Sequence, residues 1–224
     1  MPDDLGLNYN YIRKLILQTM VNNNFEASSL SVEEEEKKEE KKGEELRPTE
    51  RGEEIWEEIK KGNFYNTDKL TTLSEEVARI LGESDLDSLY LDGLQEITDQ
   101  QAEYLAAFQG KEISLDGLQE ITNQQAQHLA GFRGKTLYLD GLQGITDQQA
   151  QHLAGFEGEW LFLSGLQKLT DQQAQYLASS TVERLYLRGL QKLTHQQAEY
   201  LANFQGKISI KDGLKEKIKK YKKI

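Results

Sequence analysis

The chain has 224 residues, of which 37% are hydrophobic and 29% are charged, and its formal net charge is −11. This charge disfavours non-specific binding to duplex DNA. Cysteine is absent, which excludes disulfides, thiolate metal sites and cysteine nucleophiles. We find neither a signal-peptide pattern nor an apolar run long enough to span a bilayer. We therefore expect a cytoplasmic protein, although a protein delivered into another cell by a specialised secretion system would have the same features.

The first 64 residues are expected to form an α-helical N-terminal extension. Residues 1–31 carry apolar side chains at helical spacing, which predicts an amphipathic helix that either packs on the first repeat or docks a partner. Residues 32–48 are interpreted as a charged linker, because their run EEEEKKEEKK contains no apolar residue. Residues 49–64 are expected to form a capping helix.

Residues 65–213 contain an internal repeat. Glycines recur every 24 residues, at Gly93, Gly117, Gly141, Gly165, Gly189 and Gly213. The unit reads L-x-L-x-G-L-Q-x-(I/L)-T-x-Q-Q-A-x-x-L-A-x-F-x-G, and a fixed period of this length is typical of a solenoid. Tyr65 to Leu86 matches the unit as a degenerate first repeat. Residues 214–224 are interpreted as a basic C-terminal capping helix.

Each unit predicts one strand and one helix. The two leucines of L-x-L point to one side of a short strand, because side chains alternate along it. The glycine after the strand is expected to permit a sharp turn. A threonine with glutamine three residues later forms a capping box that starts a helix, at Thr98, Thr122, Thr146, Thr170 and Thr194. Left-handed glycine caps are predicted to end the helices at Gly110, Gly134 and Gly158.

The strand pattern resembles the leucine-rich-repeat family, whose units read L-x-x-L-x-L-x-x-N-x-L. Leu86–Leu91 and Val182–Leu187 match its first six positions, and the resemblance covers about two-thirds of the chain. It is most similar to short bacterial variants in which L-x-L-x-G-L precedes a Thr- or Ser-capped helix. The family's asparagine, which bonds the backbone as a ladder, is replaced by Leu94, Leu118, Leu142, Leu166 and Leu190. The resemblance implies an α/β solenoid, with a parallel sheet on one face and helices on the other, that recognises proteins through its strand face.

The residues between and beside the strand leucines form three outward columns. The middle column is Tyr90, Ser114, Tyr138, Phe162, Tyr186 and Ser209; the column before it is Ser88, Glu112, Thr136, Trp160, Arg184 and Lys207; the column after it is Asp92, Asp116, Asp140, Ser164, Arg188 and Lys211. Central aromatic residues and an acidic-to-basic gradient predict partner binding at Tyr90, Asp92, Asp116, Tyr138, Asp140, Trp160, Phe162, Arg184, Tyr186 and Arg188. Alternatively, the aromatic residues form ladders that only stabilise the sheet.

The sequence offers little support for catalysis or metal binding. His128 and His152 lie one repeat apart, but a third zinc ligand is not evident. The row of Asp92, Asp116 and Asp140 could attract a cation or a basic partner, and Asp-Gly turn chemistry explains it better than a calcium site. Phosphate-loop, nucleophile-elbow and metalloprotease motifs are missing. We therefore expect no enzyme activity, cofactor or metal.

The favoured function is a non-catalytic scaffold that binds another protein, with neither nucleic acid nor membrane as its partner. One alternative is a structural protein that self-associates through the N-terminal helix or the solenoid ends. The other is a protein that binds anionic surfaces through the C-terminal lysines. The sequence does not determine the oligomeric state.

Overall fold

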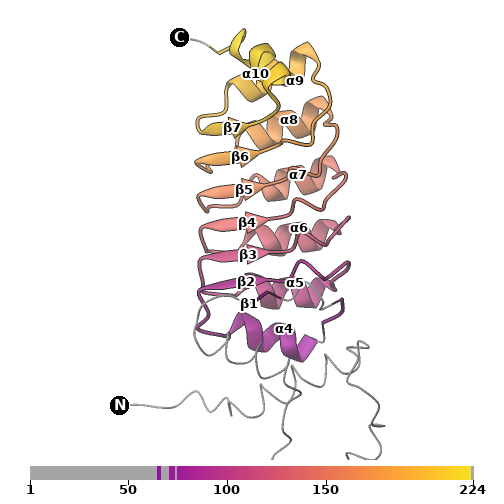
Figure 1. The fold of residues 1–224 in the computed structure, drawn as a ribbon, viewed down its shortest axis with the longest axis vertical. Coiled ribbons are helices and arrows are strands. Elements are labelled where there is room, and N and C mark those ends of the chain that lie inside the picture. The colour runs from indigo at the N-terminus through magenta and orange to yellow at the C-terminus, as the bar shows by residue number, and fades with distance from the viewer. Residues whose placement is uncertain (1–64, 67–70, 74, 223–224) are drawn as a thin grey trace, which may run out of the picture.

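The computed structural model describes residues 65–66, 71–73 and 75–222, apart from a few side chains near its start. The predicted N-terminal helix (1–31), charged linker (32–48) and capping helix (49–64) lie outside the described residues. Figure 1 shows short strands stacked along one side of the molecule and helices stacked along the other. Within this part of the chain, no helix has the length and apolarity needed to cross a membrane.

Strand and helix alternate without exception in the described residues. The strands are β1 (Tyr65–Asn66), β2 (Ser88–Tyr90), β3 (Glu112–Ser114), β4 (Thr136–Tyr138), β5 (Trp160–Phe162), β6 (Arg184–Tyr186) and β7 (Lys207–Ser209). The helices are α4 (Glu75–Gly82), α5 (Asp99–Ala106), α6 (Asn123–Ala130), α7 (Asp147–Leu153), α8 (Asp171–Ala178), α9 (His195–Ala202) and α10 (Asp212–Lys219). The seven strands form one sheet in chain order, and every neighbouring pair is parallel. The predicted α/β arrangement of a parallel sheet against a layer of helices is confirmed.

The register of the sheet follows the sequence period. Leu89 lies opposite Ile113, and each later strand repeats this pairing at the equivalent residue. The last step is one residue shorter, because Leu185 pairs with Ile208. The strand leucines and the inward alanines and leucines of the helices are fully buried, so each unit closes its core against the next.

The predicted capping boxes are present in α5 to α9. Their glutamines also connect the repeats. In α7, Gln149 is buried, accepts the Thr146 N–H at 2.7 Å and donates to the Ile121 carbonyl of the preceding repeat at 2.5 Å. Equivalent bonds to the preceding loop are made by Gln101, Gln125, Gln173 and Gln197. One side chain thus satisfies polar groups of two units, which are costly to bury unpaired.

The prediction of left-handed glycine caps is wrong. Helices α5 to α9 end in right-handed conformation at Ala107, Gly131, Ala154, Ser179 and Asn203. Gly110, Gly134 and Gly158 lie further along the chain, and none has a φ in the left-handed region. A Cβ added at Gly158 would lie 2.1 Å from Cζ of Phe156, and the other two glycines are covered by Phe108 and Phe132 in the same way. Glycine fits these positions because a phenylalanine ring lies over each of them and a carbonyl oxygen of the preceding repeat is also close, 2.7 Å from the added Cβ at Gly158.

The glycines that follow β3 to β6 also have a packing role. A Cβ added at Gly141 would lie 2.0 Å from the carbonyl oxygen of Asp116 in the preceding repeat, and at Gly165 the distance to the Asp140 oxygen is 2.1 Å. These glycines have no left-handed φ either. The close approach of successive backbones therefore explains the regular spacing of these glycines better than the turn conformation that the sequence suggested.

The C-terminal helix α10 begins at Asp212, two residues before the predicted boundary, and its Leu214 and Ile218 are buried against the last repeat. His195 stands where the other capped helices have Asp or Asn, and its Nδ1 lies 2.8 Å from the Tyr221 hydroxyl. In the earlier units this position accepts a bond from the next threonine, as in Thr170 to Asp147 at 2.7 Å. The substitution at His195 thus adapts the last repeat to its cap.

Candidate functional site

The strand face carries all ten residues predicted to bind a partner. They lie on or directly after β2 to β6, on the side of the sheet opposite the helices. The parallel register brings equivalent residues of successive repeats into rows, since neighbouring strands lie about 4.8 Å apart. What each row can do depends on the contacts its side chains already make.

The aromatic row forms a continuous stack at the C-terminal half of the face. The ring centroids of Tyr138 and Phe162 are 4.3 Å apart, and those of Phe162 and Tyr186 are 3.8 Å apart with nearly parallel planes. All three side chains are half-buried. Because the rings stack on one another, they present edges and the tyrosine hydroxyls to solvent. The ladder is therefore structural in part, and its exposed rim carries the positive edge of the aromatic quadrupole.

Two arginines lie over aromatic rings at this part of the face. The guanidinium of Arg184 lies 5.5 Å from the Trp160 ring centroid, and that of Arg188 lies 5.8 Å from the Tyr186 ring. Arg188 Nε also donates to Ser209 Oγ at 2.8 Å. These contacts fix both guanidinium groups beside the aromatic stack and leave Trp160 half-buried.

The aspartates form a ladder between repeats, a role that the sequence reasoning missed. Asp92 Oδ1 accepts the backbone N–H of Asp116 at 3.0 Å, Asp116 Oδ1 accepts that of Asp140 at 2.6 Å, and Asp140 Oδ1 accepts that of Ser164 at 2.5 Å. This replaces the interpretation as Asp-Gly turn chemistry. The signal was available in the sequence, because one carboxylate recurs beside the strand in three consecutive units while the family's asparagine position is leucine.

In the acidic half of the face, the pKa values of two side chains are raised. Burial, together with Asp140 and Asp92 nearby, raises the pKa of Asp116 to about 6. Burial and a hydrogen bond from its own hydroxyl to Glu112 raise the pKa of Tyr90 far above its usual value. Cations brought close to this half by a partner would favour the ionised form of Asp116.

Two positions in the outward columns are not accessible. Ser114 and Thr136 are each only 2% exposed, although their columns were expected to point to solvent. Ser114 lies in register between Tyr90 and Tyr138, and Thr136 lies beside Trp160. Small side chains are covered by large neighbours on the adjacent strands. The accessible face is therefore formed by ring edges, carboxylates and arginines.

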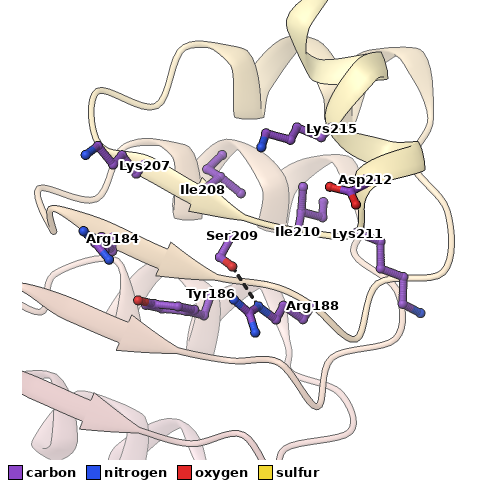
Figure 2. Close-up of a pocket in the computed structure, with 10 residues that line it drawn as sticks. All are labelled: Arg184, Tyr186, Arg188, Lys207, Ile208, Ser209, Ile210, Lys211, Asp212 and Lys215. Carbon is purple, nitrogen blue, oxygen red and sulfur yellow. Dashed lines mark hydrogen bonds between the residues drawn. The ribbon is translucent and has the colours of Figure 1, made fainter.

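A hollow of about 710 Å³ opens at the C-terminal end of the face (Figure 2). Ile208, Ser209 and Tyr186 lie in its middle, and five cations surround it: Arg184, Arg188, Lys207, Lys211 and Lys215. The sequence columns included Lys207 and Lys211, but the predicted site omitted both. Lys215 was missed because it comes from α10, which only the tertiary fold brings next to β7. We call this hollow the basic groove.

No protein-family model matches this chain, and no curated protein is significantly similar to it. In the described residues, no group of three or more His, Cys, Asp or Glu side chains is placed to hold a metal ion. Each aspartate of the row uses one carboxylate oxygen, Oδ1, to accept a backbone N–H of the next repeat.

Proposed function

We propose that this chain is a non-catalytic protein-binding scaffold of the leucine-rich-repeat type, and that its partner binds the strand face. The observation that carries the proposal is the polarity of this face around a fixed aromatic centre. Asp92, Asp116 and Asp140 line one half, and the cations of the basic groove line the other. Asp116 follows β3 and Arg188 follows β6, so these two residues lie three strand spacings, or about 14 Å, apart.

Such a face favours a protein with the reverse polarity. The aromatic centre supplies apolar area through groups whose rotamers are already fixed by stacking and by Arg184. Preorganised side chains lose little conformational entropy when a partner binds. The charged halves orient the partner and exclude proteins of the wrong polarity. The inter-repeat ladder of backbone and side-chain bonds supports the leucine-rich-repeat assignment, because it connects successive turns beside the strand.

Affinity capture from the native lysate tests this proposal. We would compare the wild-type protein with the double variant Trp160→Thr/Phe162→Ser. The replacements are residues that other repeats already carry at the equivalent positions, Thr136 one repeat away and Ser114 two repeats away, so the variant should fold. A matched control, Gln127→Ala/Gln151→Ala, changes exposed residues on the opposite, helical side.

We expect one protein to be retained by the wild type and the control and lost by the strand-face variant. Circular dichroism melting of each variant checks that the solenoid remains intact. Equal capture by all three proteins would show that the strand face is not the binding surface.

A further inference from the structure

The basic groove has a composition that distinguishes it from the rest of the face. Its five cations come from three elements: Arg184 and Arg188 from β6 and the residues after it, Lys207 and Lys211 from β7 and the residues after it, and Lys215 from α10. A single carboxylate, Asp212, lines the same hollow. In the part of the chain that the structure describes, none of the five cations forms an ion pair.

The spacing of these cations defines two rows. Arg184 pairs in register with Lys207. Arg188 follows Arg184 by four residues, and Lys211 follows Lys207 by four residues. Along a strand, four residues span about 13 Å, and neighbouring strands lie about 4.8 Å apart. Carboxylates four residues apart in an extended segment are separated by the same distance. Tyr186 lies between Arg184 and Arg188 in the chain, and the edge of its ring faces the hollow. Ile208 also lines the hollow and is partly exposed, although it pairs with the buried Leu185 and packs partly against the core.

We propose that the basic groove takes an acidic segment of the protein partner, with carboxylates on the two cationic rows and an apolar side chain between them on Ile208 and Tyr186. This inference deepens the proposed function and rests on it, because it assigns the chemistry of the partner at one end of the same face. Ring edges and cations both attract carboxylate oxygens.

Two other anionic partners fit less well. Single-stranded nucleic acid binds proteins through bases stacked on open aromatic faces. Here one face of Tyr186 is stacked on Phe162, and the guanidinium of Arg188 lies over its ring as well. A long polyanion would also continue toward Asp140 and Asp116 and meet like charge. A planar bilayer presents a flat surface, whereas the five cations surround a hollow that Ile208 and Ser209 line.

The test is fluorescence anisotropy with the full chain and a labelled peptide, Gly-Ser-Glu-Glu-Leu-Glu-Glu-Gly-Ser. A second peptide replaces the four glutamates with glutamines, and a ten-residue oligothymidylate represents nucleic acid. The groove variant is Arg188→Gln/Lys207→Gln/Lys211→Gln. The control variant, Lys168→Gln/Lys192→Gln/Lys220→Gln, removes the same charge at exposed positions that do not line the groove.

We expect the acidic peptide to bind the wild type and the control variant alike, and to bind the groove variant about 30-fold more weakly, about threefold for each exposed charge pair lost. The glutamine peptide should show no binding, and added salt should weaken binding of the acidic peptide. Equal loss in the groove and control variants would overturn the proposal, because attraction would then follow net charge alone. Tighter binding of oligothymidylate than of the peptide would assign the groove to nucleic acid instead.

The outcome separates this inference from the proposed function. If the acidic peptide fails to bind while Trp160→Thr/Phe162→Ser still abolishes partner capture, the groove assignment is wrong and the strand face remains the binding surface. The lysines of β7 would then serve only to protect an edge strand from pairing with other chains. If the peptide binds as expected while capture is unaffected by the strand-face variant, the proposed function is wrong at the aromatic centre.

Discussion

In most repeats, a buried phenylalanine lies in the connection between the helix and the next strand. Its ring competes for space with the side chain of the residue two positions later. Wherever the unit has phenylalanine it has glycine two residues on, as at Phe108, Phe132, Phe156 and Phe204. The unit with Ser180 has Val182 instead, and both side chains are buried. We predict that these two positions exchange as a pair, so that Ser180→Phe/Val182→Gly is far less destabilising than its two components together.

The magnitudes follow from the packing. Val182 is 2% exposed, so Val182→Gly leaves a cavity and should lower the free energy of unfolding by about 3 kcal/mol. Ser180→Phe alone would place ring atoms about 2 Å from the valine Cβ, as judged from the 2.1 Å between Phe156 Cζ and a Cβ built on Gly158. Such overpacking costs about 1–3 kcal/mol. The double variant should lie within about 2 kcal/mol of the wild type, a coupling of about 3 kcal/mol.

Urea unfolding followed by circular dichroism measures all four proteins, with the m-value used to check that each unfolds as one unit. As a control, Val182→Gly is combined with Leu89→Ala, four strands away, where the two costs should add within about 0.5 kcal/mol. If the costs of Ser180→Phe and Val182→Gly also add, the ring and the valine do not share one space, and the explanation of Gly110, Gly134 and Gly158 fails.

Two further predictions concern the polar ladders. The raised pKa of Asp116 means that the folded state holds its proton more tightly than the unfolded chain, so the stability contributed by the protonated form is lost as the pH rises from about 4 to about 6. Asp116→Asn keeps the hydrogen-bond acceptor but removes the charge. Urea unfolding should show a gain in the free energy of unfolding of about 1 kcal/mol at pH 7.5, after discounting for solvent screening, and no gain at pH 4. An equal gain at both pH values would contradict this cause. Gln149→Ala leaves two backbone groups without a partner and should lower the free energy of unfolding by about 2–4 kcal/mol in the same assay. Gln151 is exposed on the same helix, so Gln151→Ala should change the stability little. Similar effects of both variants would refute the inter-repeat role of Gln149.

Some parts of the site could be predicted from the sequence and others could not. The outward columns followed from the period of two within each strand and the period of 24 between them, so the sequence placed Trp160, Arg184 and Arg188 on one face. It left open whether the aromatic residues stack, as Phe162 does between two tyrosines, and it did not predict that Ser114 is covered. Exposure at these positions depends on the sizes of neighbours one repeat away, which matter only once the sheet register is set.

The sequence by itself determined the repeat, the alternation of strand and helix and the capping boxes, because each depends on residues a few positions apart and on a fixed period. Only the tertiary structure decided why the glycines after the strands are required, which groups of the neighbouring repeat the aspartates and Gln149 bind, and how Lys215 joins Arg188 around one hollow. These features depend on atoms of the neighbouring repeat or of the C-terminal helix, at separations of 24 residues or more, as between Gly141 and the Asp116 oxygen. Stacking of the units brings such atoms together, and no pattern within a single unit specifies the contact.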